Sequence, residues 1–124
     1  TSVGTQNIIK AMNKYQIHRL LVVSSLGVGD SKDQISTAFK LVASTILRKV
    51  MIDKEQQEKI VMASKLKWTI VRPSGLTNGP KTNNYIVGTG KDIMAKRVSR
   101  ANVADFLLKI LGKDQYVQEA VAIT

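Results

Sequence analysis

The sequence contains no cysteine. This absence excludes disulfide bonds, thiolate metal sites and a cysteine nucleophile, and it agrees with a reducing compartment. No apolar run approaches the ~18–20 residues that a membrane-spanning helix needs. The first residues, Thr1 to Thr5, are neither basic nor followed by a long apolar segment, so they do not resemble a signal peptide. We therefore expect a cytoplasmic protein that does not enter a membrane.

Aromatic residues make up only 5% of the chain, whereas the formal net charge is +10. A charge of this sign favours anionic partners such as nucleic acid, an acidic membrane or a phosphorylated cofactor. The basic residues are spread along the chain, however, so solvated helix faces also explain the charge. No basic stripe carries interleaved aromatic residues for base stacking. A nucleic-acid-binding module is therefore an alternative that the charge alone supports.

The 124 residues fit a single domain, and a composition of 44% hydrophobic and 23% charged residues is typical of a globular chain. Helical patterns alternate with short apolar runs, which are typical of strands covered on both faces. The predicted helices cover residues 3–15, 36–65 and 100–111, and the predicted strands cover 16–24, 67–71, 85–87 and 121–123. This alternation predicts an α/β fold in which helices lie on the faces of a parallel sheet.

The ends of the predicted helices carry recognisable capping residues. Ser2 is a plausible N-cap of the first helix, and Asp53 with Gln56 resembles a capping box that allows a break in the second. Ser99 is expected to cap the third helix and Gly112 to follow its last residue. The buried stripe of this helix is expected to hold Val103, Ala104, Leu107, Leu108 and Leu111.

In parallel sheets, ligands bind beyond the carboxyl ends of the strands. Two predicted loops occupy that position, residues 24–31 and residues 72–78. The first loop begins with Ser24 and Ser25, whose hydroxyls can bond a bound carbonyl or amide group. Serine also commonly ends a strand and begins a turn, so the pair has a purely structural alternative.

Two further segments are candidates for binding. Lys54 lies near the start of a helical segment, where a positive charge is mildly unfavourable, so it either binds ribose hydroxyls or is a surface lysine paired with Glu58. The second loop begins with Arg72-Pro73-Ser74-Gly75. Pro73 stops the strand and Gly75 permits another group to approach closely, although a plain turn needs the same residues.

The sequence gives little support for a catalytic triad, a metal site or a dinucleotide fingerprint. His18 is the single histidine, and we expect it on the surface at the start of a strand. Nothing places it near Ser25 for a serine–histidine–aspartate triad, and no cluster of metal ligands is apparent. Gly88-Thr89-Gly90 is too short to be a dinucleotide fingerprint, and no Gly-x-Gly-x-x-Gly occurs.

Five segments that together span almost the whole chain carry a family resemblance. They are Gly4-Thr5-Gln6-Asn7-Ile8-Ile9 with Ala11-Met12, Val22-Val23-Ser24-Ser25, Lys54 followed by Glu58, Trp68-Thr69-Ile70-Val71-Arg72-Pro73, and Ser99-Arg100-Ala101-Asn102-Val103-Ala104-Asp105-Phe106. In this order and spacing they resemble the atypical short-chain dehydrogenase/reductase group, with its NmrA-like and flavin reductase (biliverdin reductase B)-like members. The resemblance implies a Rossmann-type, doubly wound parallel sheet that binds NADP or NAD.

The resemblance also implies roles for particular residues. It aligns the family's active-site serine with Ser25 and places Ser24 beside the nicotinamide. The lysine of the family's Tyr-x-x-x-Lys motif aligns with Lys54, but Val50 occupies the tyrosine position. Ser25 and Lys54 are thus the expected catalytic residues, and both are also expected to contact the cofactor. The loop that wraps the nicotinamide in relatives corresponds to Arg72, Pro73, Ser74, Gly75 and Leu76. Asn102 stands where relatives often carry Asp.

In relatives, an N-terminal half supplies the glycine-rich turn, the pyrophosphate site and the residues that choose between NADP and NAD. The resemblance therefore implies that this chain is the C-terminal part of such a domain. The strand predicted over 16–24 would then lack one neighbour. We expect it to form an exposed apolar edge that invites pairing with another chain.

The function expected from the resemblance is an NAD(P)H-dependent reductase. Its small-molecule substrate would be a conjugated or carbonyl acceptor such as a flavin or a quinone. The replacement of the motif tyrosine by Val50 keeps a second function open, because NmrA-like proteins include non-enzymatic regulators that sense NAD(P).

Overall fold

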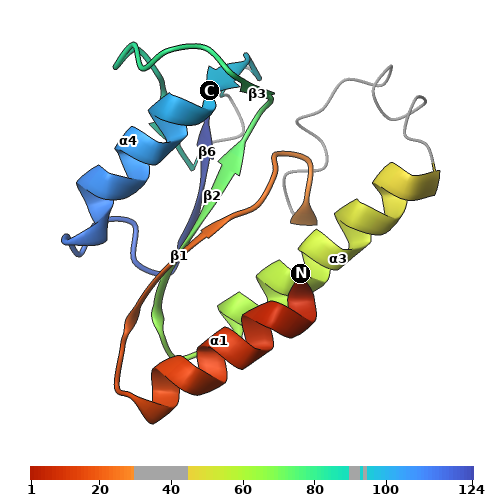
Figure 1. The fold of residues 1–124 in the computed structure, drawn as a ribbon, viewed down its shortest axis with the longest axis vertical. Helices are drawn as coiled ribbons and strands as arrows, with labels where there is room; N and C mark the ends of the chain where they lie inside the picture. The colour runs from red at the N-terminus through yellow and green to blue at the C-terminus, as the bar shows by residue number, and fades with distance from the viewer. Residues whose placement is uncertain (30–44, 90–92, 94) are drawn as a thin grey trace.

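Helices cover both faces of a central sheet in the computed structural model (Figure 1). The structure describes residues 1–29, 45–89, 93 and 95–124. Its elements are α1 (Ser2–Lys14), β1 (Arg19–Val23), α3 (Thr45–Met62), β2 (Lys67–Pro73), β3 (Leu76–Thr77), β4 (Val87–Gly88), β5 (Val98–Ser99), α4 (Arg100–Leu111) and β6 (Glu119–Ile123). Their order confirms the predicted α/β class.

The main sheet has the strand order β1-β2-β6-β4. β1, β2 and β6 run parallel, with Val23 opposite Val71 and Pro73 opposite Ile123, whereas β4 runs antiparallel to β6. The short strands β3 and β5 form a separate parallel pair. The parallel strands bring their carboxyl ends to one edge of the sheet, as the predicted Rossmann-type arrangement requires.

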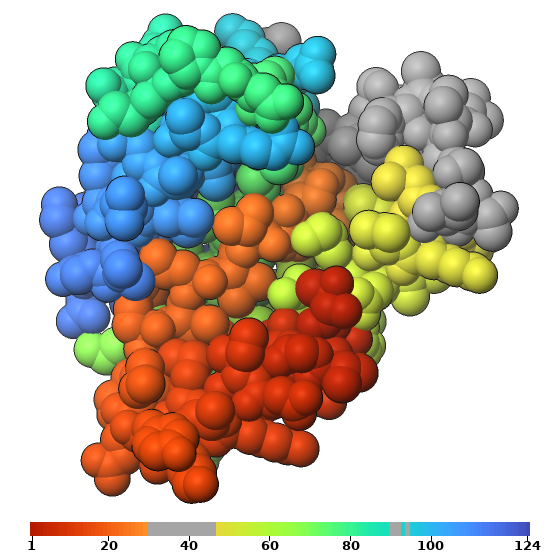
Figure 2. Space-filling model, viewed as in Figure 1, coloured from red at the N-terminus to blue at the C-terminus, as the bar shows by residue number. Residues whose placement is uncertain are grey.

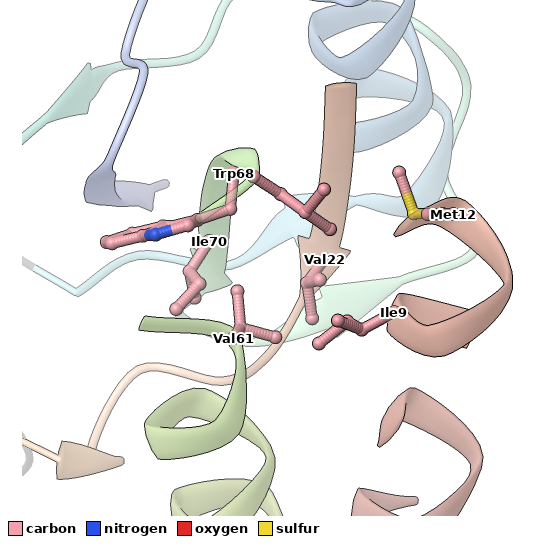
Figure 3. Close-up of a cluster of buried hydrophobic side chains, with 7 residues drawn as sticks. Ile9, Met12, Val22, Val61, Trp68 and Ile70 are labelled. Atoms are coloured by element: carbon pink, nitrogen blue, oxygen red, sulfur yellow. The ribbon is translucent and has the colours of Figure 1, made fainter. Parts of the chain in front are cut away.

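α1 and α3 pack apolar side chains onto one face of β1 and β2 (Figure 3). The buried cluster consists of Ile9, Met12, Val22, Val61, Leu66, Trp68 and Ile70. Ile9 and Met12 lie three positions apart, so both face the sheet from one side of α1. Full burial of an aliphatic side chain of this size contributes ~1.5–3 kcal/mol, which makes this cluster a main source of stability.

α4 covers the opposite face of the sheet through a second cluster. Its members are Val71, Val98, Val103, Phe106, Ile110, Val121 and Ile123. The predicted stripe of α4 was partly wrong, because Ala104, Leu108 and Leu111 lie exposed to solvent. Asn102 is buried instead, since its side chain bonds the loop before β4. The buried face of α4 therefore includes a polar residue, Asn102, beside Val103, Phe106 and Ile110.

The predicted boundaries of α4 are confirmed. The Ser99 side chain accepts a hydrogen bond from the Asn102 amide at 3.1 Å, so Ser99 is the N-cap. Gly112 follows the last residue as expected, although its φ of −91° is not the left-handed conformation usual for a glycine there.

The start of α1 differs from the prediction. Ser2 is the first helical residue and Thr1 occupies the cap position without a side-chain hydrogen bond. The Ser2 amide and hydroxyl both donate to Asp53 Oδ1, at 3.1 and 2.6 Å. The Ser2 hydroxyl is the largest cause of the lowered pKa of Asp53. Asp53 does not break α3, which runs through it from Thr45 to Met62. The predicted helical residues 36–44 lie outside the described part.

The strands also differ in detail from the sequence prediction. β1 begins at Arg19 rather than at Gln16, because Gln16 has a φ of 56° and the Ile17 amide donates back to Met12 O at 2.9 Å. β3 and β5 were not predicted as strands, since two-residue strands leave no periodic pattern.

β1 pairs with β2 and has no second neighbour among the described strands. Figure 2 shows the atoms of β1 at the surface between α1 and α4. This agrees with the exposed sheet edge that we expected. No helix within the described part of the chain combines the length and apolar character of a membrane span.

Candidate functional site

The segments that follow β1 and β2 meet at the carboxyl edge of the sheet. The Ser24 amide donates to Val71 O at 2.8 Å, and the Leu26 amide donates to Pro73 O at 3.0 Å. The Ser74 amide donates to Ile123 O at 3.2 Å. The two predicted binding loops are therefore joined to each other and to β6 by backbone hydrogen bonds.

Ser24 and Ser25 differ in their surroundings. Ser24 is buried, and within the described residues its Oγ has no hydrogen-bond partner. Ser25 is partly exposed, and its hydroxyl donates to Leu26 O at 3.2 Å. A buried hydroxyl without a partner is costly, so the Ser24 hydroxyl is a position at which a ligand can add a hydrogen bond.

The described part of this loop, which ends at Gly29, is held in place by its own residues, whereas positions 30 and 31 lie outside the described part of the chain. Leu26 and Val28 are buried at 4% and 1% exposure. Gly27 and Gly29 have φ values of 88° and 59°, a backbone conformation that residues with a side chain rarely adopt. Two buried anchors and two left-handed glycines fix the course of the chain directly after Ser25.

Lys54 reaches the same edge from α3. Its Nζ donates to the carbonyl oxygen of Val23, the last residue of β1, at 3.4 Å. The structure thus places Lys54 at the end of the strand that leads into Ser24 and Ser25, which is the grouping that the family resemblance implies. Val50 lies one helical turn before Lys54 and is 47% exposed. An apolar side chain at that position has no proton to donate.

Glu58 does not pair with Lys54, the partner that the helical spacing allowed. Its carboxylate accepts from Arg72 Nε at 3.1 Å and from Arg72 Nη2 at 2.7 Å. Glu58 and Arg72 are 2% and 4% exposed. The side chain of Arg72 therefore lies in an internal ion pair beneath the loops, while its backbone leads into the second loop.

The second loop is anchored by backbone contacts with the segment before α4. The Ser74 hydroxyl donates to Lys96 O, and the Val98 amide donates to Gly75 O at 2.8 Å. A Cβ at Gly75 would lie 3.7 Å from the aliphatic stem of Arg97. Pro73 is buried and Leu76 is exposed. The loop from Arg72 to Leu76 thus has a fixed backbone and several accessible groups.

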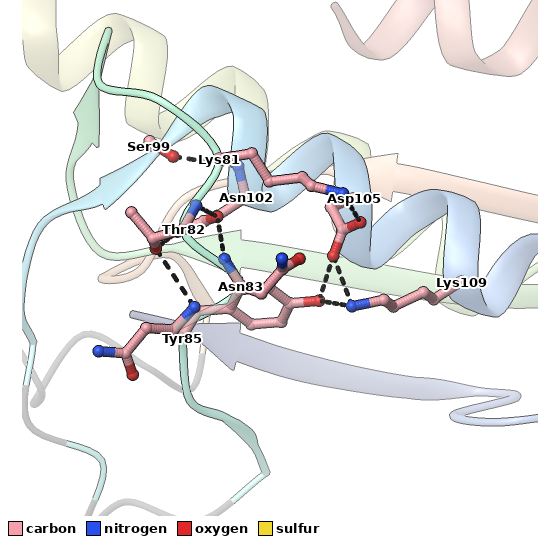
Figure 4. A network of polar contacts seen from close by, with 9 residues as sticks. Lys81, Thr82, Asn83, Tyr85, Ser99, Asn102, Asp105 and Lys109 are labelled. Carbon is pink, nitrogen blue, oxygen red and sulfur yellow. Dashed lines mark hydrogen bonds and ion pairs between the residues drawn. The ribbon is translucent and has the colours of Figure 1, made fainter.

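A polar network joins the segment before β4 to α4 (Figure 4). Asn102 Oδ1 accepts from the Thr82 and Asn83 amides at 2.9 and 3.3 Å. The Tyr85 hydroxyl donates to Asp105 Oδ2 at 2.9 Å, and Lys109 Nζ lies 2.6 Å from the same oxygen. The Lys109 ammonium, followed by the Tyr85 hydroxyl, lowers the pKa of Asp105 to about 2.

Sequence reasoning did not find this network. Tyr85 and Asp105 are 20 positions apart, and only the packing of the segment against α4 brings them together. The network fastens the segment before β4 to α4 and includes none of Ser24, Ser25 and Lys54.

Two other features lie away from the carboxyl edge. His18 is exposed and precedes β1, at the opposite end of the strand from Ser25, as expected. A shallow groove of about 420 Å³ lies between α1 and the end of α3 and is lined by Gln6, Ile9, Lys10, Ile60, Ala63 and Ser64. Among the residues described, no group of His, Cys, Asp or Glu side chains could hold a metal ion.

The arrangement at the carboxyl edge combines a buried hydroxyl, an accessible hydroxyl, a lysine ammonium and a tightly held backbone. Such groups can bind an amide, a carbonyl oxygen and sugar hydroxyls at the same time. Parallel α/β sheets bind nucleotide cofactors at this edge.

Comparison with known proteins identifies the family. A family model described as NAD(P)H-binding matches residues 1–114. The chain belongs to this NAD(P)H-binding family, which confirms the expected cofactor class and agrees with the resemblance to the NAD(P)-binding, atypical short-chain dehydrogenase/reductase group.

Individual relatives and solved structures are similar to almost the whole chain. An uncharacterised chloroplastic protein of Arabidopsis thaliana is 30% identical over 121 residues, which are 97% of this chain and 43% of the relative. An anaerobilin reductase of Escherichia coli O157:H7 (ChuY) has a TM-score of 0.85 at 24% identity over 98% of this chain and 57% of that one. A short-chain dehydrogenase/reductase of Veillonella parvula in complex with NADP has a TM-score of 0.77 at 20% identity over 99% of this chain and 58% of that one.

The chain therefore spans about half of the length of these proteins. The structural likenesses confirm the Rossmann-type fold. The Arabidopsis relative is chloroplastic, so the cytoplasmic location expected from the sequence stays a prediction.

Proposed function

We propose that this chain forms the nicotinamide side of an NAD(P)H-dependent reductase that acts on a conjugated or carbonyl acceptor. The observation that carries the proposal is the grouping of Ser24, Ser25 and Lys54 at the carboxyl end of β1. Membership of the NAD(P)H-binding family supports the cofactor class. The acceptor class rests on the resemblance to short-chain reductases.

The residues at this edge fit the nicotinamide half of such a cofactor. The buried Ser24 Oγ, which has no partner in the described part of the chain, would gain one from the nicotinamide amide. Lys54 would bond ribose hydroxyls, and the loop from Arg72 to Leu76 would cover the ring. We propose that the additional length present in the relatives carries the groups that bind the phosphates.

When bound, the reduced nicotinamide supplies a hydride to the acceptor. The Ser25 hydroxyl would turn from Leu26 O and donate to the acceptor's carbonyl oxygen. The Lys54 ammonium would lend positive potential where negative charge develops on that oxygen. The proton would come from solvent, directly or through the Ser25 hydroxyl or the Lys54 ammonium, because Val50 has none to give.

A second candidate function is a regulator that binds NAD(P) without turnover. The exposed Val50 in the place of the motif tyrosine supports it, since the usual acid is missing. Both functions require the same cofactor contacts, so they differ only in whether an acceptor is reduced.

Cofactor titration of the full-length protein tests both functions. We expect NADPH or NADH to bind, as measured by the change in nicotinamide fluorescence. For the reductase, nicotinamide absorbance falls when a flavin, a quinone or a conjugated carbonyl compound is added. Binding without loss of absorbance across this panel favours the regulator, and no binding of either cofactor rejects both functions.

A further inference from the structure

The ion pair of Glu58 and Arg72 lies at the junction of the segments that form the candidate site. Glu58 is on α3 and Arg72 is near the end of β2. Two side-chain nitrogens of Arg72 donate to the two carboxylate oxygens of Glu58, at 3.1 and 2.7 Å. Both side chains are almost completely buried. A two-pronged contact of this kind fixes the relative orientation of both groups as well as their distance.

The loop after β1 lies directly against this pair. A Cβ on Gly29 would lie 3.0 Å from Glu58 Oε2 and 3.2 Å from Arg72 Nη2. Gly29 also has a φ of 59°, which disfavours a side chain independently. The ion pair thus packs directly against Gly29 in the loop that follows β1.

The pair therefore touches or adjoins every candidate site segment. Lys54 precedes Glu58 by four positions in α3, so the two side chains lie on the same side of this helix. Arg72 immediately precedes Pro73, whose carbonyl accepts from the Leu26 amide at 3.0 Å. Ser25 immediately precedes Leu26 in this loop.

Burial of two charges brings little net stability, since well-packed apolar residues often serve as well or better. In some proteins, however, buried polar groups are retained because they define the arrangement of their neighbours rather than for stability. We propose that Glu58 and Arg72 are positioning residues, which hold Lys54 and the Ser24–Gly29 loop in the arrangement that binds the cofactor. This inference rests on the proposed function.

The test compares variants of the full-length protein for thermal stability and for NADPH affinity. Glu58→Gln places a neutral amide opposite the Arg72 guanidinium, and we expect affinity to fall by about 10- to 100-fold, as for other small misplacements of binding groups. In the double variant Glu58→Met with Arg72→Met, we expect stability to return toward wild type while affinity stays low. Recovery of affinity together with stability, or unchanged affinity in Glu58→Gln, would overturn the proposal.

Two further variants keep the test decisive. Asp105→Asn perturbs the network on α4 away from the site, and we expect it to lower stability without changing NADPH affinity. A parallel loss of affinity in this control would indicate a general effect of destabilisation and would overturn the proposal.

If the double Met variant does not fold, Arg72→Lys keeps the charge without the two-pronged contact. Unchanged affinity in Arg72→Lys contradicts positioning, and a tenfold or greater loss supports it.

Amide hydrogen exchange of the loop distinguishes failure of this inference from failure of the proposed function. We expect faster exchange at Gly27 and Gly29 in Glu58→Gln than in wild type, with or without cofactor. If the wild-type protein binds neither NADPH nor NADH, the proposed function fails, and faster loop exchange still supports positioning. Unchanged loop exchange overturns positioning even if the cofactor binds.

Discussion

The Nζ atom of Lys54 lies 3.4 Å from the carbonyl oxygen of Val23, the last residue of β1. A cation from α3 is thereby held at the carboxyl end of a strand, where parallel sheets bind their ligands. Removal of this ammonium should act on binding rather than on folding, because a carbonyl at the end of a strand can also be hydrated.

We predict that Lys54→Met in the full-length protein raises the Kd for NADPH or NADH by about 10- to 100-fold, the range expected for loss of a charge-assisted hydrogen bond. Fluorescence titration measures the change. Lys49→Met, an exposed lysine on the same helix, is the matched control and should leave the Kd unchanged. Equal Kd values for both variants would show that Lys54 does not contact the cofactor.

A second prediction concerns the buried hydroxyl of Ser24, which has no partner in the described residues. Ser24→Ala removes an unsatisfied group, so the free energy of unfolding without cofactor should stay the same or rise by up to ~1 kcal/mol. The Kd for cofactor should rise by about 2- to 10-fold, because one hydrogen bond to the nicotinamide is lost. Denaturant unfolding and cofactor titration measure the two quantities. A clear loss of stability would show that Ser24 has a structural partner instead.

The sequence predicted the features that depend on local periodicity. The helix predicted over 100–111 and its Ser99 cap agree with α4. A cap residue and an apolar spacing both involve positions that are close together in the sequence, so they can be recognised without the fold. The alternation of helices and strands also placed Ser24 at the carboxyl edge of the sheet, whereas only the family resemblance brought Lys54 to the cofactor.

Features that depend on how elements pack could not be predicted. Glu58 and Arg72 are 14 positions apart, and only the contact of α3 with β2 shows that they pair. The buried stripe of α4 was misjudged because Leu108 and Leu111 also have helical spacing. The burial of Asn102 decides between the two stripes, and it arises from a loop 20 positions earlier in the chain.

A third prediction tests that role of Asn102. Its Oδ1 accepts from two amides, and its Nδ2 donates to Thr82 Oγ1 at 2.9 Å. Asn102→Leu leaves both amides without an acceptor and should lower the free energy of unfolding by ~2–4 kcal/mol. Asn102→Asp keeps both acceptor bonds and adds a favourable charge in the first turn of α4, so it should change stability by less than ~1 kcal/mol. Urea denaturation measures both, and equal losses in the two variants would contradict the assigned contacts.

A fourth prediction concerns acid stability. Hydrogen bonds from Lys109 and Tyr85 lower the pKa of Asp105 to about 2. Because this folded-state pKa lies below the unfolded value of ~3.9, the carboxylate stabilises the fold above pH ~4, and this contribution disappears as the pH falls toward 2. Wild type should therefore unfold at a higher temperature than Asp105→Asn at neutral pH, and the difference should shrink between pH 4 and pH 2. A difference independent of pH would show that the charge of Asp105 does not matter.

The last prediction concerns the edge of the sheet at β1, which has no second strand neighbour among the described residues. Unpaired backbone groups along an apolar edge strand favour pairing with another chain, and a charged side chain on such a strand opposes it. We predict that the 124-residue chain by itself associates as its concentration rises, so that its mass in solution exceeds 13.6 kDa. Val23, which is 39% exposed at the end of β1, is a suitable position for a charge. Val23→Lys should reduce the association, whereas Val3→Lys on the exposed surface of α1 should not. Analytical ultracentrifugation over a concentration series measures the mass, and a monomer at every concentration would show that this edge does not drive pairing.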